Sequence, residues 1–234
     1  MWPPDYFSAA FGAVSVMAAL HHRNRTGDGQ VIDLGQVDAM AAVMGTVYLD
    51  YLVNGRVQSP MGNRHPYFAP HGCYSCKGHD AWCVIAVQND DEWKHLIQAT
   101  GNPKWASDPK FATMTDRLAN VAELDRHIED WTKDQTPYQV MQILQKASVP
   151  ASAVYDGQDV FLDPHLRQRG FLVEVDDPST GPVHYPASFV RLSETPSVVE
   201  RCHGLGEDNK YVLGTIMGLP PAEIERLTDA GVLS

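Results

Sequence analysis

The chain has little positive charge, few cysteines and no hydrophobic run long enough to cross a bilayer. Its 234 residues include 18 Lys and Arg against 29 Asp and Glu, which gives a formal net charge of −11. This balance argues against nucleic acid or an anionic membrane as a partner, because both attract basic surfaces. A hydrophobic content of 44% and a charged content of 20% are typical of a folded globular protein rather than a disordered one.

The longest apolar stretch, residues 7–20, is too short to span a membrane as a helix. Asp5 precedes it and Arg23 and Arg25 follow it, which reverses the charge order of a signal peptide. Since the stretch is apolar on every side of a helix, we expect it to be buried inside a cytoplasmic protein.

The four cysteines allow two interpretations. Cys73 and Cys76 have the spacing of zinc ligands, and His71 and His79 lie close to them in the sequence. A zinc ribbon usually supplies a second close pair, however, and Cys202 stands far along the chain. The aromatic and β-branched residues of this segment indicate a strand that buries its thiols, so we predict reduced cysteines and no metal site.

Hydrophobic periodicity and turn residues predict a mixed chain of helices and strands. Helices are predicted over residues 6–22, 38–52, 91–100, 114–133, 137–147, 163–169, 208–217 and 221–230. Strands are predicted over residues 30–34 and 150–155, in a hairpin over 72–87, and in a pair formed by 171–175 and 183–189. The connector of residues 56–70, which is polar and carries glycine and proline, marks a boundary between two lobes.

Asp5 is the most informative residue, because its carboxylate stands directly in front of the apolar helix. The amides at a helix start attract negative charge, and apolar surroundings leave that charge weakly hydrated. Such an Asp is either a helix cap or a nucleophile, and the two roles are compatible.

Six segments of the chain carry a family resemblance. The first runs from Asp5 through the Ala-Ala-Leu of residues 18–20 to the Thr-Gly-Asp-Gly-Gln of residues 26–30. The later segments are residues 62–70, 82–93, 108–111, 163–170 and 205–209. In this order they resemble the CoA-transferases of family III, the CaiB–BaiF group, and the resemblance covers the whole chain.

The resemblance implies an α/β fold, with part of a split Rossmann-like large lobe plus a smaller α+β lobe. Residues 1–58 would hold the large-lobe segment with the nucleophile helix, and residues 59–160 the small lobe. Residues 161–234 would return to the large lobe and end in C-terminal helices. In the family, a Rossmann-type segment precedes the Asp and supplies most contacts to coenzyme A. We therefore expect this chain to be the C-terminal portion without that segment, with the phosphate-binding cations on the missing segment or on another subunit.

The resemblance also implies the chemistry and the site. The family moves CoA between carboxylic acids, and by its place in the motif Asp5 matches the nucleophile that forms a mixed anhydride and then an aspartyl-CoA thioester. An acyl-CoA and a small carboxylic acid would then be substrates, with no bound cofactor. Arg64 either pairs with a substrate carboxylate or pins the connector to a neighbouring lobe, and His71 and Gly72 would line the same entrance. Because family members form interlocked dimers, we expect a homo-oligomer or a partner subunit.

Two alternatives stay open. α-Methylacyl-CoA racemases share the Asp but use it in proton transfer with a His from the earlier segment, and they tend to carry a Glu shortly after a strand like residues 84–87. Here Asp90 is the residue that would have to serve in that place. The other alternative is a non-catalytic chain, either a truncated product or one subunit of a split enzyme. Such a chain exposes an unpaired apolar sheet edge, so we expect it to associate.

Overall fold

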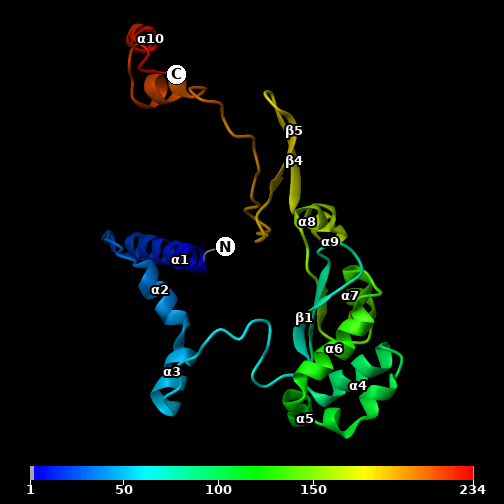
Figure 1. The fold of residues 1–234 in the computed structure, drawn as a ribbon. Coiled ribbons are helices and arrows are strands. Elements are labelled where there is room, and N and C mark those ends of the chain that lie inside the picture. Colours follow the sequence, from blue (N-terminus) through cyan, green and yellow to red (C-terminus); the bar gives the residue numbers. More distant parts are fainter. Residues whose placement is uncertain (1–2, 234) are drawn as a thin grey trace.

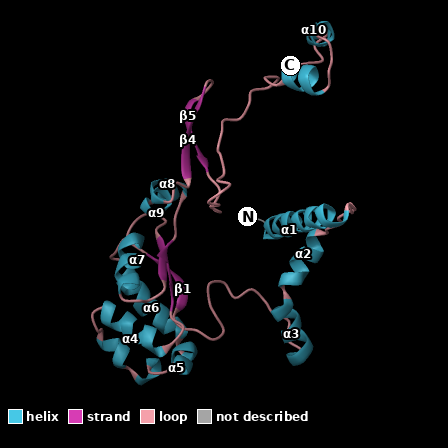
Figure 2. Cartoon of the chain, turned by 180° about the vertical axis from the view of Figure 1, so that it is seen from behind, coloured by secondary structure: helices cyan, strands magenta, loops and turns pink. Residues whose placement is uncertain are grey.

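The computed structural model describes residues 3–233, which form three groups along the chain (Figure 1). The first group consists of the helices α1 (Pro3–Thr26), α2 (Gln36–Val43) and α3 (Gly45–Asn54). A long connector, without helix or strand, leads from it to a lobe in which helices surround a small sheet. The third group contains a β-hairpin and the C-terminal helices, so that the strands lie in two separate places (Figure 2).

The first group confirms the helix predicted over residues 6–22, and α1 extends it at both ends. Gly27, at φ 88°, lies just after α1 in a conformation that suits glycine. The helix predicted over residues 38–52 is instead two helices, because the chain turns at Met44 (φ −94°, ψ 20°). The strand predicted over residues 30–34 is wrong: the segment is not paired in either sheet of the described chain.

The expectation that the first helix is buried is also wrong for this structure. No residue of α1 is buried, and Tyr6, Val14 and Met17 are 62%, 68% and 67% exposed. The helix is apolar on several sides, whereas it packs mainly against α2, so most of its apolar surface stays open. Exposed apolar surface of this extent is a feature of interaction sites.

The lobe is built on an antiparallel sheet in the order β1 (His71–Ser75), β2 (Trp82–Ala86) and β3 (Ala151–Ala153). This confirms the hairpin predicted over residues 72–87 and a shorter form of the strand predicted over 150–155. The surrounding elements are α4 (Asp90–Ala99), η1 (Lys104–Ser107), η2 (Pro109–Phe111), α5 (Met114–Ala119), α6 (Val121–Thr132) and α7 (Pro137–Lys146). The helix predicted over residues 114–133 is interrupted at Asn120, which ends α5 and precedes α6.

The hydrophobic core belongs to this lobe. Among the described residues, every buried apolar side chain except Ala39 lies between Ala69 and Val149. The sheet contributes alternate residues to it, and α6 and α7 contribute residues one helical turn apart. The members from these elements are Tyr74, Cys83, Ile85, Leu124, Ile128, Val140 and Leu144.

One buried cation ties the lobe together. The Arg117 side chain is fully buried, and its guanidinium donates to the Ala69 carbonyl at 3.0 Å and to the Phe111 carbonyl at 3.2 Å. The same group donates to Asp90 Oδ1 at 2.8 Å and lies 4.7 Å from the centre of the Trp93 ring. A buried charge is tolerated when each of its donors finds a partner, as they do here.

The cysteines confirm the prediction of buried thiols at two of the four positions. Cys76 and Cys83 are buried beside each other, whereas Cys73 is partly exposed and Cys202 is exposed. Burial raises the pKa of the Cys76 and Cys83 thiols, so both stay protonated at neutral pH. Within residues 3–233, no group of three or more His, Cys, Asp or Glu side chains is arranged to hold a metal ion.

The third group begins with the short helices α8 (Gly157–Leu162) and α9 (Pro164–Gln168). The strands β4 (Leu172–Asp177) and β5 (Gly181–Pro186) then pair as predicted around a turn in which Asp177 Oδ1 accepts from the Ser179 and Thr180 amides. The helix predicted over residues 208–217 is a π-helix, η3 (Lys210–Ile216), and α10 (Pro221–Asp229) follows it. No helix within residues 3–233 combines the length and the apolar character needed to cross a membrane.

Replacing Arg117 by Met tests the buried cation. We expect Arg117→Met to lower the free energy of unfolding by about 3 kcal/mol, because two buried carbonyls and Asp90 lose their donor. Urea unfolding followed by circular dichroism measures the change. Arg126→Met, at an exposed position on α6, is the matched control and should change stability by less than about 0.5 kcal/mol. A loss below about 1 kcal/mol for Arg117→Met would contradict this account.

Lysine substitutions test whether the open face of α1 drives association. We expect the wild-type chain to associate at micromolar concentration and the Val14→Lys, Met17→Lys double variant to associate at least about tenfold more weakly, because two apolar side chains leave the contact. Sedimentation velocity measures this difference. Leu205→Lys, at a position that is 89% exposed outside the helices, should leave association unchanged. A monodisperse wild-type monomer would rule the association out.

Candidate active site

Asp5 lies inside the first turn of α1, as the third residue of the helix, rather than in front of it. The helix-cap interpretation of Asp5 therefore fails in its strict sense, because an N-cap residue precedes the helix. The carboxylate still lies at the positive end of the helix dipole. Its Oδ1 accepts a hydrogen bond of 2.9 Å from the Gln36 side chain, which lies at the start of α2.

The other three predicted site residues line one pocket. Arg64, His71 and Gly72 surround a cavity of about 310 Å³ where the connector enters β1, together with Tyr74 and Asp125. A second cavity, of about 610 Å³, shares His71 and Gly72 and is otherwise lined largely by small and apolar residues of the sheet. Neither lining includes a residue of α1, so the structure places Asp5 in a different group from the other three (Figure 1).

Arg64 forms an ion pair with Asp125 of α6, with 2.9 Å between a terminal nitrogen and Oδ2. The Arg64 side chain is 48% exposed, and the pair holds the connector against the lobe. Of the two interpretations of Arg64, the structure thus shows the contact that pins the connector. That contact uses one terminal nitrogen, and a guanidinium has further N–H donors that can meet a carboxylate.

His71 has a defined tautomer in its neutral form. Its Nδ1 lies 2.8 Å from the Asn63 carbonyl oxygen. Because a carbonyl oxygen accepts and never donates, Nδ1 must carry the proton, and Nε2 is then the acceptor nitrogen. The ring also lies 5.3 Å from that of His65, whose own ring stacks on Phe68. The connector therefore fixes the orientation of His71 at the pocket.

Gly72 is required by the ring of Tyr74. A Cβ at position 72 would lie 2.8 Å from the Tyr74 hydroxyl oxygen and 2.9 Å from the ring carbon that bears it. That hydroxyl donates to Asp125 Oδ1 at 2.9 Å, so Asp125 accepts from Tyr74 while it pairs with Arg64. Burial is the main cause that raises the pKa of the Tyr74 hydroxyl, which therefore remains a donor. The glycine thus makes room for the side chain that positions Asp125.

Asp90, on which the racemase alternative depends, has a structural contact. Its Oδ1 accepts from the buried Arg117 guanidinium at 2.8 Å. Its place at the start of α4 also puts it among the acidic residues that favour a helix N-terminus. The structure therefore gives Asp90 a role in holding the lobe together, and no observation connects it with Asp5.

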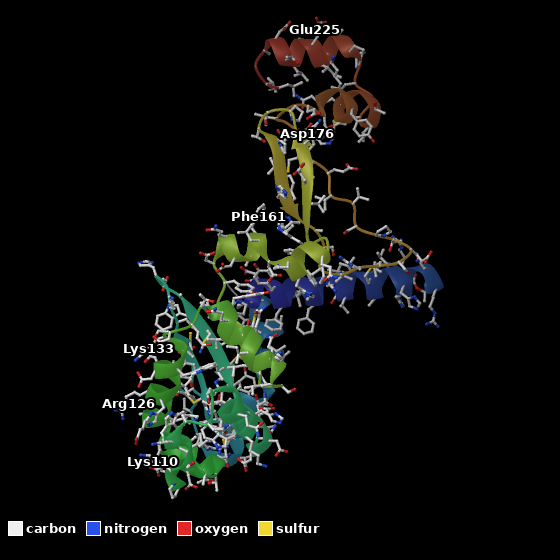
Figure 3. The ribbon with its side chains drawn as sticks, turned by 90° about the vertical axis from the view of Figure 1, so that its right-hand side faces the viewer. Lys110, Arg126, Lys133, Phe161, Asp176 and Glu225 are labelled. Atoms are coloured by element: carbon white, nitrogen blue, oxygen red, sulfur yellow. The ribbon has the colours of Figure 1, made fainter. Side chains whose placement is uncertain are left out.

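Two lysines on the lobe surface are paired with acidic neighbours. Lys110, Arg126 and Lys133 lie along one side of the lobe (Figure 3). Lys110 Nζ lies 2.6 Å from Glu123, and Lys133 Nζ lies 2.5 Å from Asp130. These pairs neutralise both ammonium groups, so they do not favour this side for the phosphates of coenzyme A.

Sequence analysis missed three residues that the structure places at the predicted sites. Gln36 reaches Asp5 across 31 positions, and Tyr74 reaches Asp125 across 51. Neither pair follows a helical or strand spacing that would link its members. Only Asp125 has a local signal in the sequence: it follows the buried Leu124 on α6 and so begins the polar side of that helix.

Comparisons with known proteins show which family the chain resembles. The model of CoA-transferase family III matches residues 1–209. The chain is 33% identical over 224 residues to succinyl-CoA–D-citramalate CoA-transferase of Chloroflexus aurantiacus, covering 95% of this chain and 56% of that protein. It is 29% identical to the beta subunit of succinyl-CoA–L-malate CoA-transferase of the same organism, covering 98% of this chain and 57% of that subunit.

The fold has a solved counterpart in a CAIB/BAIF family protein from Brucella suis. The two share 31% sequence identity and a TM-score of 0.77, over 91% of this chain and 55% of that one. The mixed fold of helices and sheet is therefore that of the CaiB–BaiF group. The chain spans about half the length of the curated relatives it matches. With its matched segments, its fold and its level of identity all in agreement, the chain belongs to CoA-transferase family III.

Proposed function

We propose that this chain carries the nucleophile of a CoA-transferase, which moves CoA between two carboxylic acids through an aspartyl-CoA thioester on Asp5. The observation that carries the proposal is the Asp5 carboxylate, held in the first turn of α1 by a neutral donor within the matched family segment. The helix amides and dipole favour negative charge at this position. The carboxylate is therefore poised as a nucleophile, because its contact within the described residues is a neutral amide rather than a cation.

CoA transfer proceeds through two nucleophilic attacks, which the acceptor acid then reverses. One oxygen of Asp5 attacks the carbonyl carbon of the acyl-CoA, the C–S bond breaks, and CoA leaves as the thiolate. The thiolate then attacks the Asp5 carboxyl carbon of the mixed anhydride and releases the acyl group as a free carboxylate. The acceptor acid reverses the two steps and departs as its CoA thioester. The energy of the thioester is conserved because no water enters, and no bound cofactor or metal takes part.

We infer the substrate class from the names of two relatives. Both the D-citramalate enzyme and the L-malate subunit are named for succinyl-CoA as the CoA donor and for a dicarboxylic acceptor. We extend this to the present chain as succinyl-CoA and a small dicarboxylic acid. Arg64 then pairs with the carboxylate remote from the reacting centre, and His71 and Gly72 border the same entrance. Such a protein is cytoplasmic and works as a homo-oligomer or with a partner subunit.

The adjoining cavities suit this assignment. The cavity at Arg64 has a cation and an imidazole in its wall, whereas the one of about 610 Å³ has walls of small and apolar residues. A dicarboxylate needs one charged contact and a narrow apolar passage for its methylene carbons. Bringing Asp5 to these cavities requires that the α1 group and the lobe meet, either within one molecule or between two.

Replacing Asp5 tests the nucleophile. After incubation with succinyl-CoA, we expect the wild-type chain to gain the mass of CoA on the peptide that contains residue 5. Asp5→Asn should abolish this adduct and lower CoA exchange by roughly 10³-fold or more, because an amide does not attack the thioester. Intact-mass spectrometry and peptide mapping measure the adduct.

Asp33→Asn is the matched control, since Asp33 is also exposed and lies outside the helices. It should leave the adduct and the exchange unchanged. An adduct that persists in Asp5→Asn would show that another residue is the nucleophile. A folded wild-type chain that forms no adduct would favour the alternative, in which the chain is a non-catalytic subunit that needs a partner with the coenzyme site.

A further inference from the structure

The segment after α1 runs back along the helix and delivers Gln36 to Asp5. Residues 30–35 have no helix or strand structure, and Leu34 packs against α1 at Gly12, where a Cβ would lie 3.6 Å from its side chain. Two residues later, at the first position of α2, the Gln36 amide nitrogen lies 2.9 Å from Asp5 Oδ1. The contact thus joins two helix starts that are 31 positions apart.

The start of α2 is shaped so that Gln36 holds this place. Gly35, the residue before α2, has extended backbone angles (φ −82°, ψ 134°). A Cβ there would lie 2.6 Å from Asp38 Oδ2, so the absence of a side chain lets the Asp38 carboxylate fold back over the helix start. A side chain at position 35 would therefore require the Asp38 carboxylate to move away from the helix start.

We propose that Gln36 is a catalytic residue that donates to Oδ1 of Asp5 throughout the transfer; this inference rests on the proposed function. The hydrogen bond fixes the plane of the carboxylate and leaves Oδ2 as the attacking oxygen. Oδ2 then forms the bond to the acyl carbon, and Oδ1 becomes the carbonyl oxygen of the anhydride on the Asp5 side.

The donor matters most when CoA thiolate attacks the Asp5 carboxyl carbon. In that tetrahedral intermediate the negative charge sits on Oδ1, the atom that Gln36 already contacts. The bond to Oδ2 then breaks, the acyl carboxylate leaves, and Oδ1 becomes the carbonyl oxygen of the aspartyl-CoA thioester. A preplaced N–H donor stabilises such an oxyanion without reorganising during the reaction.

A neutral amide suits this role better than a cation. Lys or Arg at position 36 would pair with the resting carboxylate and weaken it as a nucleophile. The Gln36 amide instead forms a hydrogen bond that strengthens as charge gathers on Oδ1. The competing explanation is that the contact simply holds α2 against α1, and the experiment separates the two.

Three variants form the test, with succinyl-CoA and isotopically labelled succinate as the substrates, so that the label entering succinyl-CoA measures the transfer. Gln36→Leu should lower kcat by about 10²-fold and leave the KM for succinyl-CoA within about twofold, because an oxyanion donor acts in the transition state. Gln98→Leu, at an exposed glutamine on α4, should change neither constant. Circular dichroism and unfolding by urea should give the same values for all variants, because Asp5 and Gln36 are both exposed.

Gln36→Glu gives a readout that a purely structural contact would not move. At pH 7.5 the introduced carboxylate repels the Asp5 carboxylate, with Asp38 adding negative charge nearby, and kcat should fall further than in Gln36→Leu. As the pH falls towards about 5, the introduced group takes up a proton and becomes a donor. The activity of this variant relative to wild type should then rise at least fivefold, whereas that of Gln36→Leu should stay constant.

The outcomes separate the two proposals. If Asp5→Asn is inactive and Gln36→Leu keeps kcat within threefold of wild type, the role of Gln36 is overturned and the nucleophile stands. The role of Gln36 is also overturned if the Gln36→Glu variant shows no relative gain at low pH. If Asp5→Asn stays active or the wild-type chain shows no exchange, the proposed function falls, and the role of Gln36 falls with it.

Discussion

The arrangement of the elements within the lobe depends on the buried guanidinium of Arg117. It is the one charged side chain that is buried in the described part of the chain, and it bonds to points that lie far apart in the sequence. Its contact with the Ala69 carbonyl fixes the end of the connector, two residues before His71 begins β1. Its contacts with Phe111 and Asp90 fix η2 and the start of α4 to the same point. Arg117 therefore fixes the position of the connector at the entrance of the candidate cavity, although it does not line that cavity.

Local pattern was sufficient for much of the fold. The helices of the lobe and both hairpins were predictable because their apolar spacing and turn residues lie within a few positions of one another. The strand expected over residues 30–34 failed because a strand needs a partner, which no local pattern supplies. The breaks at Met44 and Asn120 were missed because neither residue is a helix breaker. The division into residues 1–58, 59–160 and 161–234 remains a prediction.

The sequence was sufficient to predict which residues belong to the candidate site, but not which residues they contact. Resemblance to the family pointed to Asp5, Arg64, His71 and Gly72, and the last three line one pocket. What each side chain contacts depends on residues of other elements: Gln36 for Asp5, and Asp125 for Arg64. Contacts across 31 or more positions arise from packing, so sequence spacing carries no record of them. Gly72 is an example: we expected it to line the substrate entrance, but the structure shows that a glycine is needed there to make room for the ring of Tyr74.

Because the hydrophobic core is confined to one lobe, the parts of the chain should differ in how readily they unfold locally. Backbone amides in β2 and α7, which lie over the buried core, should exchange their hydrogens with solvent mainly through global unfolding. Amides of α1, which has no buried residue, should exchange through frequent sub-global opening. Asp5 and its donor thus lie in a labile part of the chain, while His71 and Gly72 lie on a strand of the protected lobe. Any molecule that bridges the two would reveal itself by slowing exchange in α1 and leaving β1 unchanged.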